Sequence, residues 1–295
     1  MGNLLTRQSH AIKAIDGPAP AKSPSWRLLP PDLRRLGVAT FGSQLDAVVR
    51  QARLQKVTGP GGQLWLTQHQ LDNSVERIAR EFTAGDPYGL RRIKKTRGLM
   101  IDVGCNVGDV AMAMTRLQPH MQVLCIEPIP STYFFLRWNL FLNNVTVLRA
   151  PADLGPAGSG GVLALNAATT GDPTPNQSVE VVFGRASQDA RLVSAAMLSN
   201  LNRTSKYLSW HHARVPSVFL PSALGAWRRV ELLKMDCELC EYDVIASAGT
   251  WFTDRSKVAF VGGELHNGAR ISSAVRKTVG EALAARGCRR HSLWC

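Results

Sequence analysis

The stretch Met100-Ile101-Asp102-Val103-Gly104-Cys105-Asn106-Val107-Gly108-Asp109 decides the fold, because an apolar run in it breaks at a glycine and leads into further apolar segments. Residues 98–103 are predicted to form a buried strand, and residues 107–118 a helix. The next apolar run, 121–127, ends on Glu127. A strand, a glycine turn, a helix and a second strand with an acid at its tip form the half-site that holds an adenosine-containing cofactor.

The glycine spacing distinguishes between cofactors. A dinucleotide fingerprint requires glycine at positions 104, 106 and 109, but the chain has Asn106 and Asp109 at the last two. These side chains crowd or repel a pyrophosphate, whereas a ligand with a sulfonium and an ammonium group needs such acceptors. Glu127 is predicted to accept both ribose hydroxyls. The alternative is a structural turn without a ligand, which the acid at the strand end disfavours.

These residues resemble the FkbM-like family of S-adenosylmethionine-dependent methyltransferases. The resemblance spans about residues 80–290 and includes Asn139 to Asn143, the Lys-x-Asp-x-Glu-x-x-Glu pattern in 233–241, and Gly263-Glu264-Leu265-His266. It implies S-adenosyl-L-methionine as cofactor and an α/β fold with a Rossmann-like, doubly wound, mostly parallel sheet. The residues predicted to bind the cofactor are Asp102, Gly104, Cys105, Asn106, Gly108, Asp109, Glu127, Pro128 and Asp153.

The acceptor side of the predicted site lies on two further strands, 230–236 and 257–264, which end at the same rim of the sheet. Asp236 is the first candidate for contact with the acceptor or for removal of its proton. His266 is the second, because its ordinary pKa suits a general base near neutrality, and Glu264 is delivered to the same rim. The alternatives are an Asp236 that only caps the following helix and a His266 without a special role.

Glu238 and Glu241 are expected to brace the loop after Asp236 or to cap the following helix. Two positions near them depart from the family pattern. The family usually has glycine where this chain has Leu239, and a branched side chain in a left-handed backbone costs about 1–2 kcal/mol. The family also carries acids where this chain reads Leu220-Pro221-Ser222. Both departures lie on the acceptor side, so a catalytically degenerate cofactor-binding scaffold is one alternative function.

The predicted function is methyl transfer to a hydroxyl group of a small molecule or glycan, which requires a base. The formal net charge of +13 favours acidic partners, so a nucleic-acid methyltransferase is the second alternative. The basic clusters, such as 91–97, are not interleaved with aromatic residues, and no RNA-binding module is recognisable.

The six cysteines are predicted to be free in a reducing compartment. Cys105 and Cys125 lie in predicted core elements. Cys237 and Cys240 are expected to be packing residues, because a zinc site needs about four ligands and the neighbouring acids disfavour a thiolate. No metal ion is expected.

The N-terminal residues Met1 to Thr6 fit the pattern for N-myristoylation at Gly2. A single acyl chain, assisted by nearby basic residues, predicts weak membrane association of an otherwise cytoplasmic protein. A transit peptide is the competing interpretation. No stretch approaches the roughly 20 apolar residues that span a bilayer.

Three parts of the chain are predicted: a basic, Pro-rich extension over 1–39, a helical cap over 40–97, and a methyltransferase domain over 98–295. In the last part, the remaining segments are assigned to strands at 145–149 and 178–183, helices at 131–142, 187–201, 241–248 and 270–286, and irregular structure at 151–177 and 207–221. Because only nine residues follow the last helix, the closing antiparallel hairpin of this class is expected to be incomplete.

Overall fold

The computed structural model describes residues 29–70, 72–184, 211–267, 271–288, 293 and 295, and the backbone alone of residues 191 and 192. Its elements follow in chain order: α1 (Pro31–Phe41), η2 (Gly42–Gln44), α2 (Leu45–Gln51), β1 (Arg53–Gly59), β2 (Gly62–Gln68), α3 (Ser74–Ala84), η3 (Leu90–Arg92), β3 (Arg97–Val103), α4 (Asp109–Leu117), β4 (His120–Ile126), α5 (Pro130–Leu142), η4 (Pro151–Asp153), β5 (Gly161–Leu165), β6 (Ala168–Thr169), β7 (Ser178–Phe183), β8 (Arg191–Leu192), β9 (His211–Val218), η7 (Leu220–Ser222), β10 (Val230–Met235), α7 (Cys240–Ala248), α8 (Thr250–Thr253), β11 (Val258–Gly263) and α9 (Ser273–Arg286).

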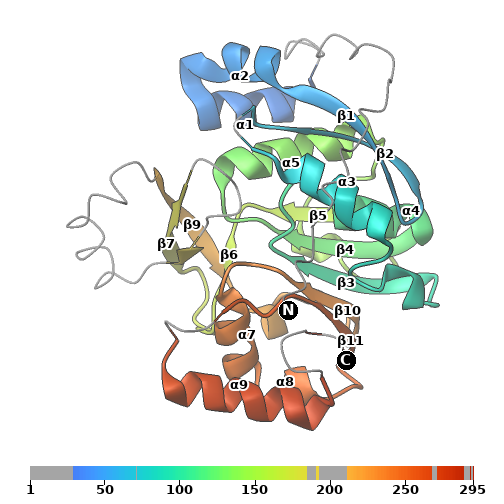
Figure 1. The fold of residues 1–295 in the computed structure, drawn as a ribbon, viewed down its shortest axis with the longest axis vertical. Coiled ribbons are helices and arrows are strands. Elements are labelled where there is room, and N and C mark those ends of the chain that lie inside the picture. The colour runs from blue at the N-terminus through green and yellow to red at the C-terminus, as the bar shows by residue number, and fades with distance from the viewer. Residues whose placement is uncertain are drawn as a thin grey trace, which may run out of the picture.

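A five-stranded parallel sheet in the order β11-β10-β3-β4-β5 forms the centre of the molecule (Figure 1). The chain leaves β3 in both directions, so the sheet is doubly wound and the predicted Rossmann-like α/β class is confirmed. In this register Asp102 of β3 lies beside Lys234 of β10 and Cys125 of β4. The carboxyl ends of the three central strands therefore meet at one rim, as expected for a ligand-binding edge.

Both faces of this sheet are buried, which explains why its strands are continuous apolar runs. Met100 of β3 packs into one core cluster with α4, α5 and the β1–β2 hairpin. Its neighbours Leu99 and Ile101 pack into a second cluster with residues of α7, α8 and α9. Figure 1 shows these two helical layers above and below the sheet. The strands and helices predicted around 98–127 and 230–286 are confirmed to within a few residues.

The segment before the sheet differs from the prediction. The predicted helical cap contains an antiparallel hairpin of β1 and β2, and α1 begins at Pro31, within the predicted extension. Asn139 of α5, which is fully buried, accounts for the position of the hairpin. Its Oδ1 accepts the main-chain N–H of Thr67 at 2.8 Å, and its Nδ2 donates to the carbonyl oxygens of Thr67 and Val107, each at 3.0 Å.

The structure differs from the predictions for four segments in the middle of the chain. Residues 145–149 form only an isolated bridge between Val147 and Val162, and the edge strand of the sheet is β5, within the segment expected to be irregular. The second irregular segment contains β9, which pairs with β7 in a small side sheet of order β6-β9-β7-β8. Residues 191 and 192 of the predicted helix 187–201 form β8, and the rest of that helix lies outside the described residues.

The outer edge of β11 is covered by two residues near the C-terminus. Cys295 and Val261 exchange main-chain hydrogen bonds, and the N–H of Leu293 donates to the carbonyl oxygen of Gly263. A disulfide joins Cys295 to Cys288, which follows α9. This short pairing lies in the place of the closing antiparallel hairpin, which the sequence predicted to be incomplete. The described helices include none that is long and apolar enough to cross a membrane. Residues 1–28 of the predicted N-terminal extension, which include Gly2, lie outside the described residues.

Candidate active site

A cavity opens at the carboxyl ends of β3, β4 and β10, where the sequence predicted the site. It is lined by residues of the glycine turn, by residues at the carboxyl ends of β4 and β10, and by residues of α3 and the loop after it. The lining residues are Arg77, Ile78, Glu81, Tyr88, Gly104, Asn106, Asp109, Val110, Glu127, Pro128, Lys234, Asp236, Cys237 and Glu238.

The glycine turn packs directly against the end of β10. Gly104 has a φ of +70°, and a Cβ there would collide with the carbonyl oxygen of Asp236. Gly108 has a φ of +87° and precedes α4, and a Cβ there would collide with Leu136. Asn106, at a φ of +49°, is one of the few non-glycine residue types that tolerate the left-handed region. Only glycine at 104 permits the glycine turn to touch the chain at the end of β10.

Glu127 is buried at the tip of β4 and ordered by main-chain donors. Its Oε2 accepts the N–H of Asn106 and its Oε1 accepts the N–H of Ile129, both at 2.9 Å. Burial raises the pKa of Glu127 to about 8, although these hydrogen bonds lower it. Burial likewise raises the pKa of Asp109 to about 7. Asn106 donates from Nδ2 to Ser74 Oγ at 3.1 Å, while its buried Oδ1 has no hydrogen-bond partner in the described part of the chain.

Asp102 lies beneath the cavity and does not line it. Its fully buried carboxylate forms an ion pair with Lys234, whose Nζ lies 2.9 Å from Oδ1. The same ammonium donates to the carbonyl oxygen of Gly104 at 2.7 Å. Burial alone would lower the pKa of Lys234, but the carboxylates of Asp102 and Asp236 outweigh it and raise that pKa well above its usual value. Lys234 of β10 therefore ties the glycine turn to its strand through this hydrogen bond.

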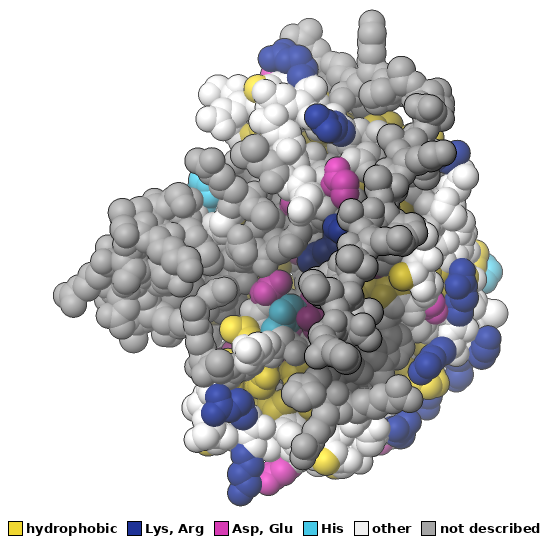
Figure 2. Space-filling model, viewed as in Figure 1, with side chains coloured by type: hydrophobic (Ala, Val, Ile, Leu, Met, Phe, Trp, Pro, Cys, Tyr) yellow, Lys and Arg dark blue, Asp and Glu magenta, His cyan; other side chains and the backbone are white. Residues whose placement is uncertain are grey.

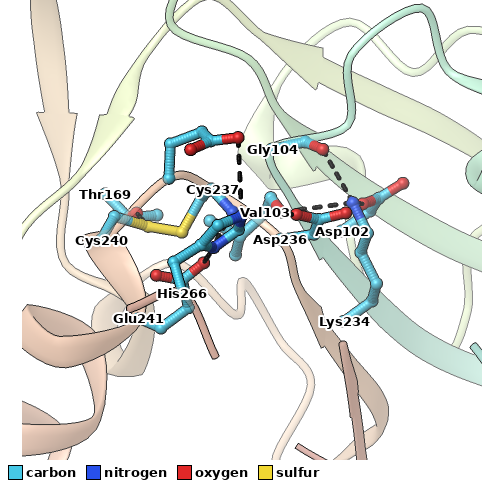
Figure 3. Close-up of a disulfide and its surroundings, with 11 residues drawn as sticks. Asp102, Val103, Gly104, Thr169, Lys234, Asp236, Cys237, Cys240, Glu241 and His266 are labelled. Carbon is cyan, nitrogen blue, oxygen red and sulfur yellow. Dashed lines mark hydrogen bonds and ion pairs between the residues drawn. A yellow bond between two sulfur atoms is a disulfide. The ribbon is translucent and has the colours of Figure 1, made fainter. Parts of the chain in front are cut away.

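A network of acids surrounds His266 beyond the end of β10 (Figure 3). Its Nδ1 lies 2.9 Å from Oε1 of the buried Glu241, which also accepts the N–H of Cys237 at 2.9 Å. Its Nε2 lies 3.6 Å from Asp236 Oδ1 and 3.5 Å from Glu238 Oε1. Burial alone would lower the pKa of His266, but Glu238 and Glu241 raise it to about 11. A pKa raised in this way disfavours the role of a neutral general base that the sequence predicted for His266.

Asp236 has a second partner that the sequence did not indicate. The hydroxyl of Tyr88 donates to Asp236 Oδ2 at 3.0 Å, and the ring of Tyr88 lies 5.3 Å from Lys234 Nζ. Burial raises the pKa of Tyr88 above its usual range, so the phenol remains a donor. Asp236 is thus held between a phenol and an imidazolium while it lines the cavity.

A disulfide joins Cys237 to Cys240 within the acidic loop (Figure 3). The prediction of unpaired packing residues is wrong for Cys237 and Cys240. Cys288 and Cys295, also expected to be free, form a second disulfide, whereas Cys105 and Cys125 are free and buried. Such disulfides are rare in reducing compartments, so the pairing counts against the cytoplasmic expectation.

The two residues between Cys237 and Cys240 are in the left-handed region, with φ of +56° for Glu238 and +87° for Leu239. Leu239 therefore occupies a strained conformation that glycine adopts without steric cost, and the disulfide closes a short ring that contains it.

The structure brings together most of the predicted site residues. Gly104, Asn106, Asp109, Glu127, Pro128 and Asp236 line the cavity. Cys105 and Gly108 belong to the turn without lining it, and Glu264 directly follows β11 at the same rim. Asp153 is not at this site: it is exposed near the opposite end of β4, where its carboxylate accepts the N–H groups of Arg149 and Ala150.

Sequence reasoning missed Arg77, Ile78, Glu81 and Tyr88, which enter the cavity from α3 and the loop after it. Their segment has only the apolar spacing of an amphipathic helix, and no local pattern assigns its polar side chains to the rim.

Asp236, Glu241 and His266 are a group of metal-ligand type within the described residues, with one ligand atom of each within 4.8 Å of the others. Nδ1 of His266 and Oε1 of Glu241 are already paired with each other. This contact is the one expected when the carboxylate of Glu241 orients a protonated ring of His266.

Comparisons with known proteins give little beyond the fold. The sequence matches no family model and no curated protein. One solved structure to which it is similar is a precorrin-6y C5,15-methyltransferase from Geobacter metallireducens GS-15, with 11% identity over 67% of each chain and a TM-score of 0.33. At that level the likeness does not bear on activity.

Proposed function

We propose that this protein is an S-adenosylmethionine-dependent methyltransferase that acts on a hydroxyl group of a small molecule or glycan. The observation that carries the proposal is the single cavity in which Asn106 and Glu127, from the cofactor half, meet Asp236, from the acceptor half. Binding sites of open α/β sheets occupy this crevice beyond the strand ends.

The residues present fit this cofactor. Each carboxylate oxygen of Glu127 accepts one main-chain N–H, which leaves lone pairs for a ribose diol. The buried Oδ1 of Asn106 lacks a donor in the described structure, and an ammonium group would supply one. Five acids line the cavity against two cations among the described residues, a balance that suits a ligand with a sulfonium and an ammonium.

When bound, this cofactor supplies an activated methyl group, so the protein has to position the acceptor and remove its proton. We assign proton removal to Asp236, which lines the cavity. Tyr88 and His266 orient its carboxylate through opposite oxygens. His266 stabilises the negative charges of Asp236 and Glu238, and Glu241 fixes the ring of His266.

Many basic side chains lie away from this cavity. Lys94, Lys95, Arg97, Arg228, Arg229 and Lys257 are exposed and lie before or at the amino ends of β3, β10 and β11, the edge of the sheet opposite to the cavity. Figure 2 shows basic side chains along the lower right of the molecule and acidic and histidine side chains near the middle. This separation favours a small acceptor over a nucleic acid guided by that edge.

Binding of S-adenosylhomocysteine, measured by calorimetry, tests the cofactor assignment. Glu127→Gln keeps the shape of the side chain but replaces one of its two accepting oxygens with an amide donor, so it should weaken binding by about tenfold or more. Glu281→Gln is the matched control, because Glu281 is exposed on α9 and its ion pair with Lys277 is distant from the cavity. Absence of binding to the native protein would refute the assignment.

Turnover is tested by release of S-adenosylhomocysteine from S-adenosylmethionine with a panel of hydroxylated small molecules and glycans. Asp236→Asn should abolish release and retain binding of S-adenosylhomocysteine. Salt-sensitive retention on RNA or DNA would favour the nucleic-acid alternative. Cofactor binding without turnover on any acceptor would favour the scaffold alternative.

A further inference from the structure

We propose that Arg77 of α3 binds the carboxylate of the cofactor's amino-acid tail, so that the segment before the sheet completes the cofactor site. This inference rests on the proposed function. Arg77 lines the cavity together with Asn106 and Glu127, although it precedes the glycine turn by nearly thirty residues. Its Nε is buried and has no hydrogen-bond partner in the described structure.

The charges in the cavity leave one cation for this role. Of the two cations among the described lining residues, Lys234 is already bound to Asp102 and to the carbonyl oxygen of Gly104. Within the described part of the chain, the guanidinium of Arg77 has only a long contact with Glu81, at 3.7 Å from Nε to Oε1, which exceeds hydrogen-bonding distance. A carboxylate that enters a cavity with five acids needs a cation, and a guanidinium binds a carboxylate through parallel N–H groups.

The position of α3 directs Arg77 towards the glycine turn. Asn106 donates from Nδ2 to Ser74 Oγ at 3.1 Å, so the first turn of α3 lies against the middle of the glycine turn. Arg77 follows Ser74 by three residues and therefore shares its face of the helix. Glu127 holds the ribose end in the proposed function, and Asn106 and Arg77 then face the amino-acid end.

Three ligands of the native protein separate this role from a structural one. S-Adenosylhomocysteine carries the ammonium and the carboxylate, S-adenosyl-3-thiopropylamine carries only the ammonium, and 5′-methylthioadenosine carries neither. Calorimetric dissociation constants for each ligand are compared between the native protein, Arg77→Ala and Arg77→Gln. Arg80→Ala is the matched control, because Arg80 is exposed on the same helix and its Nε donates to the helix carbonyl of Glu76.

We expect both Arg77 variants to weaken S-adenosylhomocysteine binding by about 10- to 100-fold, the range of hydrogen bonds to charged groups. Binding of the other two ligands should change by less than about twofold, and Arg77→Lys should recover part of the loss. A loss that is equal for all three ligands, or no loss for S-adenosylhomocysteine, would overturn the inference while the cofactor assignment stands. A native protein that binds none of the three would refute the proposed function, and the inference with it.

Discussion

The ion pair between Lys234 and Asp102 should be a major determinant of stability, because both side chains are almost fully buried. The side chain of Lys234 is 4% exposed and that of Asp102 is 0% exposed. In Lys234→Met the apolar stem remains, but a buried carboxylate loses its cation. Breaking a buried pair from one side costs about 3–5 kcal/mol. For a chain of this size that corresponds to a melting temperature lower by on the order of 10 °C.

The double variant Asp102→Asn/Lys234→Met tests the cause of this loss. It removes both charges, so it should be more stable than Lys234→Met alone, and the coupling energy between the two substitutions should be about 2 kcal/mol or more. In the single variant Asp102 is relieved by taking up a proton. The difference in the free energy of unfolding between Lys234→Met and native protein should therefore become smaller as the pH falls towards the ordinary pKa of a carboxyl, near 4.

Urea denaturation of the native protein, Lys234→Met, Asp102→Asn and the double variant at pH 5 and pH 8 measures the free energies of unfolding that enter this comparison. Calorimetry of S-adenosylhomocysteine binding to the folded variants then shows whether the turn has moved, since Lys234 also holds Gly104. The reasoning is refuted if Lys234→Met costs less than about 1 kcal/mol at pH 8, or if the two single effects add without coupling.

Three further predictions concern the turn and the loop. The pKa of Glu127 is raised to about 8 in the folded protein. The folded state therefore binds more protons than the unfolded state between about pH 4.5 and 8. Because of this difference, the free energy of unfolding falls as the pH rises through that range. Glu127→Gln removes this dependence, and urea denaturation across the range should show the variant gaining relative to native protein as the pH rises. Leu239→Val should be less stable than Leu239→Gly by about 1 kcal/mol or more in thermal unfolding, because a β-branched residue disfavours a φ of +87° and glycine does not. The reverse order of stability would contradict the strain assigned to Leu239. Gly104→Ala should abolish S-adenosylhomocysteine binding or prevent folding, as judged by calorimetry and circular dichroism, because its Cβ would meet main-chain atoms of Asp236.

Much of the fold could be predicted because the central strands are buried on both faces. Their runs at 98–103 and 121–127 are long and apolar, and a glycine turn links β3 to α4. β5 has only five residues and is preceded by a segment rich in glycine and proline, so composition favoured a loop there. The β1–β2 hairpin had a readable signal in Gly61-Gly62, followed by the alternate buried residues Leu64 and Leu66.

The candidate site was predictable only where its residues directly follow strands. Asn106, Glu127 and Asp236 could be placed because parallel strands end at a common rim. Arg77 and Tyr88 could not, because their arrival depends on how α3 and the loop after it pack over the turn. The Cys237–Cys240 disulfide could not be predicted either, because Cys-x-x-Cys spacing is compatible with packing, metal binding or pairing. In the structure the left-handed backbone of Glu238 and Leu239 accompanies the short ring that the bond closes.

The departure at Leu239 bears on the step from binding to turnover. If strain at Leu239 displaced the loop after β10, Asp236 would lie apart from the glycine turn. Instead, Gly104 lacks a Cβ and so the turn touches the carbonyl of Asp236. The N–H of Asp236 also donates to the carbonyl oxygen of Val103 at 3.1 Å. On the other side Tyr88 and His266 hold the carboxylate. These contacts do not pass through Leu239, whose strained conformation is enclosed by the Cys237–Cys240 bond. The strain is therefore confined to a few residues beyond Asp236, and Leu239 by itself gives no reason to prefer a scaffold to an enzyme.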